Sequence, residues 1–213
     1  ERCHQLCAQL ETLGVRTLAV ACDVSREEDC KRLVDATVTE FTSLDILVNN
    51  AGYTWAADAM SYPIDKWEQV MNTNLTGLFQ LSSLAAAVMK EQGRGKIINV
   101  TSVAGLGGTA PETQNTVAYN ASKGAVMTLT RDLAVKWARY GIYVNAIAPG
   151  FFPTHMSKRL LEKNQHLVLP RVPLNRLGGE GDLKGTIVFL SSAASDYVTG
   201  QCLFVDGGIT AMV

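Results

Sequence analysis

Residues 46–52, Ile46-Leu47-Val48-Asn49-Asn50-Ala51-Gly52, join a short apolar run to a small polar turn. Three consecutive aliphatic residues predict a strand that is buried on both faces, which is the character of strands in parallel sheets. The turn that follows contains a glycine, so the backbone can come close to a ligand there. Because open α/β sheets bind ligands at the carboxyl ends of their strands, we expect a binding site where this run ends.

The same alternation of short apolar runs and longer helical patterns continues along the chain. Ser25 and Glu28 open one helical pattern with the spacing of a capping box. Because continuously apolar strands separated by helices build covered parallel sheets, we expect a doubly wound, Rossmann-like α/β sheet in three layers, α/β/α. No repeat or linker interrupts the pattern, so residues 1–213 are predicted to form one domain. Strands are predicted at residues 17–21, 46–48, 96–100, 142–147 and 202–205, and helices at residues 1–13, 25–41, 65–91, 116–140 and 182–191.

Composition argues against several classes of function. With 47% hydrophobic and 18% charged residues, the 213 residues suffice for one globular core. The net charge of -1 and the absence of basic runs give no electrostatic footprint for nucleic acid or an anionic membrane surface. No apolar run approaches the roughly 20 residues that span a bilayer. The five cysteines and three histidines lack metal-ligand spacing, so we expect reduced thiols, no metal site and a cytoplasmic location.

The stretch Tyr119-Asn120-Ala121-Ser122-Lys123 contains a candidate acid/base pair. A tyrosine and a lysine four residues apart share one face of a helix. An ammonium beside a phenol favours the phenolate, so we expect the pKa of Tyr119 to lie below its ordinary value of about 10. A lowered phenol pKa suits a general acid/base near neutral pH. The same spacing also occurs in helices where both residues are ordinary surface side chains.

Three further turns follow predicted strands and are expected at the same edge of the sheet. Cys22-Asp23-Val24 follows residues 17–21, Thr101-Ser102 follows residues 96–100, and residues 149–154, Pro-Gly-Phe-Phe-Pro-Thr, follow residues 144–148. Each of these could be an ordinary turn. Together with residues 49–52, they predict a ligand site along the carboxyl edge.

Taken together, these motifs resemble those of the short-chain dehydrogenase/reductase family, in the order and near the spacing typical of that family. The resemblance extends from Asp23 to Gly208 and implies an NAD(P)-dependent oxidoreductase that interconverts a secondary alcohol and a ketone. Residues 50–55 and 148–153 are similar to gluconate 5-dehydrogenase-type members, which implies a sugar acid or polyol as substrate. A 3-oxoacyl thioester, as in the related acyl-carrier-protein reductases, is the next candidate. The motifs are Asp23-Val24, residues 49–52, Asn72-Thr73-Asn74, Ser102, Tyr119-x-x-x-Lys123 and Pro149-Gly150.

The resemblance implies four catalytic residues, Asn74, Ser102, Tyr119 and Lys123. Tyr119 would exchange a proton with the substrate oxygen, and Lys123 would lower the pKa of Tyr119. Ser102 would stabilise charge on that oxygen. Asn74 would mark a bend in a long helix and hold a water that relays protons to Lys123.

The resemblance also implies contacts to NAD or NADP along the carboxyl edge. Asp23 would meet the adenine amino group, Val24 would pack on the adenine ring, and Lys123 would bind the nicotinamide ribose. The remaining cofactor-binding candidates are Asn50, Ala51 and Gly52 beside the ribose and pyrophosphate, Tyr119, Pro149, Gly150 and Phe152 at the nicotinamide, and Thr154 at the pyrophosphate.

One departure from the family pattern concerns the cofactor's phosphates. The family begins with a strand and a glycine-rich turn, Thr-Gly-x-x-x-Gly-x-Gly, which does not occur in these 213 residues. We therefore expect that an N-terminal βαβ unit of about 30 or more residues is missing from this sequence. The acidic or basic residue that separates NAD from NADP binding would precede Glu1, so the choice between them stays open.

A second departure is the distance of 17 residues between Ser102 and Tyr119, wider than the usual family spacing. We expect residues 105–116 to bulge at the rim of the site and residues 151–178 to form a substrate lid. The basic residues of the lid are candidates for contact with an anionic substrate, or for an ordinary solvated helix face: Arg159, Lys163, Arg171 and Arg176.

The resemblance implies a small-molecule carbonyl or alcohol substrate and a homo-oligomer, either a tetramer or a dimer. Family members commonly pair through the long helices that here contain Asn74 and Tyr119, and residues 205–208 fit a second interface. A catalytically silent cofactor-binding or scaffold member of the same fold is the alternative from another class. A hydrolase that uses Ser102 is a third hypothesis, but no Gly-x-Ser-x-Gly motif accompanies that serine.

Overall fold

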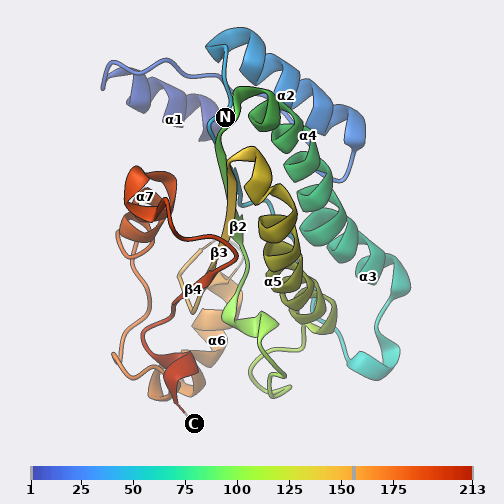
Figure 1. Ribbon diagram of the computed structural model, residues 1–213. Helices are drawn as coiled ribbons and strands as arrows, with labels where there is room; N and C mark the ends of the chain where they lie inside the picture. Colours follow the sequence, from blue (N-terminus) through green and yellow to red (C-terminus); the bar gives the residue numbers. More distant parts are fainter. Residues whose placement is uncertain (1, 155–156, 213) are drawn as a thin grey trace.

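Four of the predicted apolar runs form strands that pair in parallel as one sheet (Figure 1). The computed structural model describes residues 2–154 and 157–212. In the described part the strands lie in the order β1-β2-β3-β4, so neighbours in sequence are neighbours in the sheet. Residues Ile97 and Val144 pair across β2 and β3, which are the two central strands. The strands are β1 (Ile46–Asn49), β2 (Gly95–Val100), β3 (Ile142–Pro149) and β4 (Cys202–Val205).

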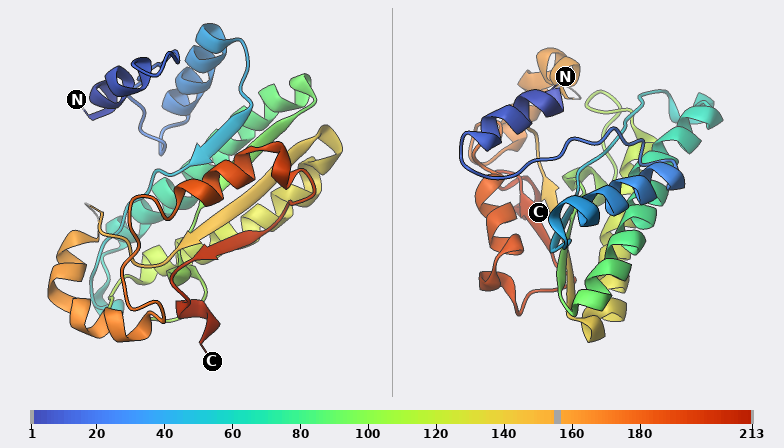
Figure 2. Two further views of the ribbon diagram at one scale, coloured as in Figure 1. Left: turned by 90° about the vertical axis from the view of Figure 1, so that its left-hand side faces the viewer. Right: turned by 90° about the horizontal axis from the view of Figure 1, so that it is seen from above.

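Helices connect the strands and cover both faces of the sheet (Figure 2). Along the strands, alternate side chains point to opposite faces. Ile97 and Val144 therefore pack against α4 and α5, whereas Ile98 contacts Leu190 of α7 on the other face. This three-layer arrangement confirms the predicted α/β/α architecture. The helices are α1 (Arg2–Glu11), α2 (Glu27–Phe41), α3 (Ile64–Met71), α4 (Gly77–Gln92), α5 (Val117–Trp137), α6 (Lys158–Val168) and α7 (Lys184–Ser191).

The segment before α2 differs from the prediction. Residues 17–21 were predicted as a strand but run as an irregular connection, because no strand of the described residues lies beside them to complete a hydrogen-bonded ladder. The predicted capping box is also wrong. Arg26 occupies the N-cap position without a side-chain cap, and Ser25 instead donates its hydroxyl to Asp23 Oδ1 at 2.7 Å.

This segment is held to the rest of the protein by a close backbone contact. A Cβ added to Gly77, the first residue of α4, would lie only 2.3 Å from the Val24 carbonyl oxygen. Glycine is therefore required where α4 meets residues 23–24. On the other side of the same connection, Cys30 and Val34 of α2 pack with Leu81 of α4.

The long helical stretch at residues 65–91 is interrupted where the sequence places asparagine. Asn72–Thr76 form a π-helical turn between α3 and α4, so one extra residue enters the helix. Such turns are frequent at functional sites. The buried residue of this turn is Asn74.

Candidate active site

The carboxyl ends of the strands open into one cavity of about 1070 Å³. Asn50 and Gly52 come from the turn after β1, Ser102 follows β2, and Pro149 ends β3. Tyr119 reaches the same cavity from the first turn of α5. The expectation that the strand-end turns share one edge is therefore confirmed for β1, β2 and β3.

Tyr119 is a partly buried phenol whose neighbour in the cavity is Ser102. Burial raises the pKa of Tyr119 above its ordinary value of 10.0, and a hydrogen bond with the Ser102 side chain opposes this rise without cancelling it. The prediction of a lowered Tyr119 pKa is therefore wrong for the chain's own residues. Burial disfavours the phenolate more strongly than the neighbouring side chains favour it.

Lys123 lies on the same face of α5 as Tyr119, one turn further along. Its side chain is almost completely buried, and burial lowers its pKa from 10.5 to about 8. The ammonium donates a hydrogen bond to the Val100 carbonyl oxygen at 2.7 Å and lies 5.6 Å from the centre of the Tyr119 ring. A positive charge is thus fixed between the end of β2 and the phenol.

Asn74 ties the turn after β1 to α5. Its Oδ1 accepts a hydrogen bond from the Tyr53 backbone N–H at 2.7 Å, and its Nδ2 donates to the Tyr53 carbonyl oxygen at 2.9 Å. The same Nδ2 donates to Ser122 Oγ at 3.0 Å, directly beside Lys123. Asn74 therefore positions two elements of the site, while its predicted role in a proton relay stays a prediction.

The predicted cofactor-binding residues divide into two groups. Those at the ends of β1 and β3 line the cavity together with Tyr119 and Lys123, whereas Asp23 and Val24 are not among the described lining residues. The Asp23 carboxylate accepts hydrogen bonds from the backbone and hydroxyl of Ser25, which lower its pKa. The group in the cavity consists of Asn50, Ala51, Gly52, Pro149, Gly150, Phe152 and Thr154.

The cavity residues fit the nicotinamide end of a dinucleotide. Gly52 lies within contact distance of Asn74 and Lys123, since a Cβ there would be 3.7 Å from Asn74 Oδ1 and 3.8 Å from Lys123 Nζ, both ordinary van der Waals distances. The Lys123 ammonium and the small residues around it suit a polar ring with a ribose hydroxyl group. The volume of about 1070 Å³ is at the upper end of the range for small-molecule sites, so a substrate and a cofactor ring fit together.

The residues between Ser102 and Tyr119 form the rim of the cavity, as the long spacing predicts. The rim begins in backbone contact with α5, since a Cβ on Gly105 would lie 2.7 Å from the Gly124 nitrogen. Asn120 Nδ2 then donates to Thr109 Oγ1 at 3.3 Å, next to the catalytic tyrosine candidate. The rim is thereby attached to the helix that carries Tyr119.

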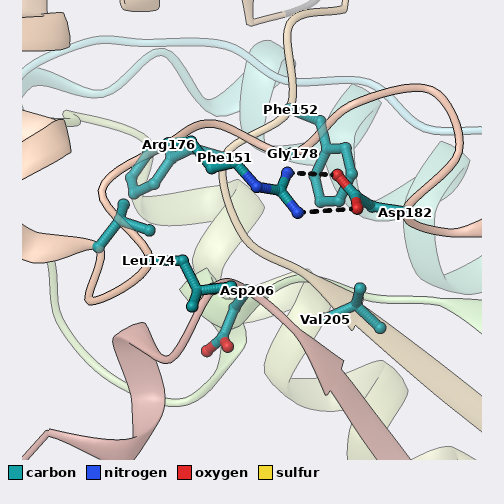
Figure 3. A pocket seen from close by; sticks show the side chains of 10 residues that line it. Phe151, Phe152, Leu174, Arg176, Gly178, Asp182, Val205 and Asp206 are labelled. Carbon is teal, nitrogen blue, oxygen red and sulfur yellow. Dashed lines mark hydrogen bonds and ion pairs between the residues drawn. The ribbon is translucent and has the colours of Figure 1, made fainter.

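Part of the predicted lid closes the other side of the cavity. Asn164 of α6 donates to the Thr113 carbonyl oxygen of the rim at 3.3 Å, and Arg171 lines the cavity. Arg176 instead forms a two-fold ion pair with Asp182 at 2.6 and 3.0 Å (Figure 3). The side chains of Arg159 and Lys163 lie outside the described residues.

Sequence reasoning missed the buried polar residues that support the site. Asn49 Nδ2 donates to Ser82 Oγ and to Asn99 Oδ1, at 2.8 and 2.9 Å, and Asn99 Nδ2 donates to Thr130 Oγ1 at 2.9 Å. This chain of hydrogen bonds joins α4, β1, β2 and α5. Its signal in the sequence was an asparagine inside the otherwise apolar run Ile97-Ile98-Asn99-Val100, which has to find partners when buried.

Comparison with known proteins agrees with this geometry. A family model described as enoyl-(acyl carrier protein) reductase matches residues 1–210. The chain belongs to the short-chain dehydrogenase/reductase family. A 2-dehydro-3-deoxy-D-gluconate 5-dehydrogenase of Escherichia coli is 41% identical over 203 residues, which cover 94% of this chain and 79% of that protein. A 3-oxoacyl-[acyl-carrier-protein] reductase of Staphylococcus aureus is 35% identical over 209 residues, covering 98% and 83%.

Solved structures of this dehydrogenase family superpose closely on the chain. A gluconate 5-dehydrogenase from Burkholderia cenocepacia, in complex with NADP and tartrate, has a TM-score of 0.92 and is 36% identical. The match covers 98% of this chain and 81% of that one. An NAD⁺-bound xylitol dehydrogenase has a TM-score of 0.91 at 33% identity, with coverages of 97% and 84%. The predicted family and fold are both confirmed.

Two features are absent from the described residues. None of the helices in residues 2–154 and 157–212 is long and apolar enough to cross a membrane. Within the same ranges, no three histidine, cysteine, aspartate or glutamate side chains gather in a group that could hold a metal ion.

Proposed function

We propose that this short-chain dehydrogenase/reductase interconverts a secondary alcohol and a ketone, with Tyr119 as the general acid/base. The observation that carries the proposal is that Ser102, Tyr119 and Lys123 line one cavity together with the turns that end β1 and β3. A binding role requires none of these three groups in particular. Carbonyl reduction requires an acid, a hydrogen-bond donor for the oxygen and a nearby positive charge.

Each side chain has a distinct task in this chemistry. During reduction the Tyr119 hydroxyl donates its proton to the substrate oxygen, and during oxidation it takes the proton back. The Ser102 hydroxyl donates a hydrogen bond to the same oxygen and stabilises the negative charge that develops there. Lys123, held by the Val100 carbonyl oxygen, favours proton loss from Tyr119 through its fixed positive charge.

The cofactor is NAD or NADP, which supplies or accepts the hydride. This assignment is supported by the relatives whose structures contain NADP or NAD⁺. Lys123 and the cavity group at the ends of β1 and β3 would hold the nicotinamide and its ribose. Asp23 and Val24 remain the candidates for the adenine.

The substrate is a small polyhydroxylated molecule, a sugar acid or polyol, rather than a 3-oxoacyl thioester. Polar side chains of the rim and of the facing part of the lid, among them Thr109, Gln114 and Asn164, line the cavity beside apolar ones. These polar groups offer donors and acceptors to several hydroxyl groups of one substrate. The names of the E. coli and B. cenocepacia relatives also favour a sugar acid.

The test is turnover of a ketone panel with NADH and NADPH, followed by the absorbance of the reduced nicotinamide. We expect Tyr119→Phe to lower kcat by about 10²- to 10⁴-fold, because only the proton-donating hydroxyl is removed. Its thermal unfolding should match that of the wild type. Tyr143→Phe is the matched control, since Tyr143 lies on β3 at the amino end of the sheet, beside Lys96.

Near wild-type turnover of Tyr119→Phe would contradict the proposed mechanism. A wild-type chain that binds the cofactor but reduces no ketone would instead support the catalytically silent alternative. Ester hydrolysis that depends on Ser102 would support the hydrolase hypothesis.

We also propose that the protein is a homo-oligomer that pairs through α4 and α5. Phe79 on α4 and Val135 on α5 are exposed apolar side chains on these helices. Sedimentation or light scattering measures the assembly directly, and Val135→Asp should shift it toward the monomer. A wild-type monomer at micromolar concentration would contradict this proposal.

A further inference from the structure

Three formally charged side chains are among the described residues that line the large cavity: Glu112, Lys123 and Arg171. Lys123 is almost completely buried and already donates to the Val100 carbonyl oxygen. Arg171, by contrast, is exposed, and it reaches the cavity from the lid. Among the described cations of this cavity, Arg171 is therefore the one that is exposed to solvent.

The backbone that carries Arg171 is firmly held. Val172 is buried with Leu161 and Val168 of α6, and this cluster also contacts Phe151 and Ile209. The following turn is fixed to the end of the chain, because Leu174 donates its backbone N–H to the Gly207 carbonyl oxygen at 3.0 Å. A guanidinium on a fixed backbone loses less freedom on binding, which favours specific recognition over a casual surface contact.

Arg176, the other described basic candidate of the lid, is already committed. Its guanidinium is paired at both nitrogens with the Asp182 carboxylate, which also accepts the Gly179 N–H at 2.6 Å. This pair borders a separate small cavity of about 130 Å³, next to Phe151 and Phe152 (Figure 3). Arg176 therefore holds the loop after the lid together, and a substrate would have to break the pair to use it.

We propose that Arg171 binds the carboxylate of an acidic substrate in the large cavity. The proposal rests on the function proposed above and deepens it, because it selects a sugar acid over a neutral polyol. The planar guanidinium matches a carboxylate with two parallel hydrogen bonds, which a neutral hydroxymethyl group at the same position cannot form. Glu112, on the opposite rim, opposes the binding of an anion and so limits the affinity.

The experiment compares D-gluconate with sorbitol, which replaces the carboxylate by a hydroxymethyl group. Ligand-observed NMR titrations give both dissociation constants without requiring turnover. We expect the wild type to prefer gluconate by at least about 10-fold, and Arg171→Leu to reduce that preference by about 10- to 100-fold. Arg171→Lys should fall between the two, because it keeps the charge and loses the two-fold geometry.

Two further variants separate this role from others. Glu112→Gln should strengthen gluconate binding, by about two- to five-fold, because a repelling charge is removed. Arg94→Gln is the matched control, since Arg94 is exposed before β2, at the amino edge of the sheet, and pairs with Asp45. It should leave both dissociation constants unchanged.

Several outcomes would overturn the proposal. If the wild type binds no gluconate, or if Arg171→Leu keeps the wild-type preference for gluconate over sorbitol, the result contradicts the role of Arg171. Weaker gluconate binding in Glu112→Gln, to the same degree as in Arg171→Leu, would mean that the two residues form a lid latch instead. If the wild type reduces no ketone, the proposed function is refuted. The proposal for Arg171 is then still tested, because gluconate binding is measured separately.

Discussion

Because of Lys123, we expect the free energy of unfolding to increase as the pH rises. A surface lysine that gains an ion pair on folding has the opposite effect, because its pKa is raised in the folded state. The pKa of Lys123 is about 8 in the folded chain and 10.5 when exposed, because burial disfavours the ammonium. Below about pH 8 both states hold the proton, and the folded state bears the cost of the buried charge. As the pH rises from there, the folded state releases the proton first, so the free energy of unfolding increases.

The size of the effect follows from the two pKa values. Each pKa unit is worth about 1.4 kcal/mol, so the full change from pH 8 to pH 10.5 amounts to about 3 kcal/mol. Tyr119 acts in the opposite direction above its ordinary value of 10.0, because burial raises its pKa. Measurement between about pH 7.5 and pH 10 avoids this interference and should show about 2 kcal/mol.

The assay is urea unfolding, followed by circular dichroism, of the wild type and of Lys123→Met across that range. The variant also loses the hydrogen bond to the Val100 carbonyl oxygen, but that loss does not vary with pH and only offsets the two curves. The quantity to compare is the difference in the free energy of unfolding between the wild type and Lys123→Met, and how steeply it changes with pH. Lys31→Met, at an exposed position on α2, is the matched control.

A difference between wild type and Lys123→Met that stays constant within about 0.5 kcal/mol would refute the reasoning. It would mean that Lys123 titrates near its ordinary value, through water or a counter-charge that offsets burial. The phenol beside it would then also experience a more polar surrounding than the structure indicates.

Three further substitutions test how the site is held. Asn74→Ala should lower the free energy of unfolding by about 2–4 kcal/mol in urea titrations, because three hydrogen bonds made by the buried Asn74 side chain are lost; a change under about 1 kcal/mol would contradict this. Gly77→Ala should cost about 2 kcal/mol or more, and lower the melting temperature, because its Cβ would lie 2.3 Å from the Val24 carbonyl oxygen; unchanged melting would mean that this contact is loose. Gly178→Ala should raise the KM for the cofactor several-fold, because its Cβ would lie 2.3 Å from the Phe152 ring and displace it; an unchanged KM would show that Phe152 does not contact the nicotinamide.

The strands show what local pattern predicts and what it does not. Residues 202–205 form a strand with the predicted bounds. This apolar run lies beside β3, which supplies the partners for its backbone hydrogen bonds. Residues 17–21 carry the same local signal and form no strand. The difference lies in pairing between distant segments, since a strand is stabilised only where another strand completes its backbone hydrogen bonds.

The site was predictable to the extent that topology determines it. Once residues 46–49, 95–100 and 142–149 pair in parallel, the turns after them have to meet at one edge, and α5 brings Tyr119 to it. The contacts of individual side chains were not accessible in the same way. The three hydrogen bonds of Asn74 depend on a π-helical turn, and the spacing of residues in the sequence does not predict such a turn.

The pKa shifts of Tyr119 and Lys123 show why the spacing of these two residues predicted the wrong direction for the Tyr119 pKa. Counting only the nearest charge, Lys123 should lower the pKa of Tyr119, but burial acts on both groups and disfavours either charged form. With a pKa of about 8, Lys123 keeps its proton at neutral pH, and Tyr119 keeps its own as well. The chain therefore holds a protonated acid beside a fixed cation, which is the state that carbonyl reduction consumes. Oxidation has to form a phenolate against the same burial, so further positive charge or hydrogen bonding in the cavity is needed before Tyr119 can act as a base.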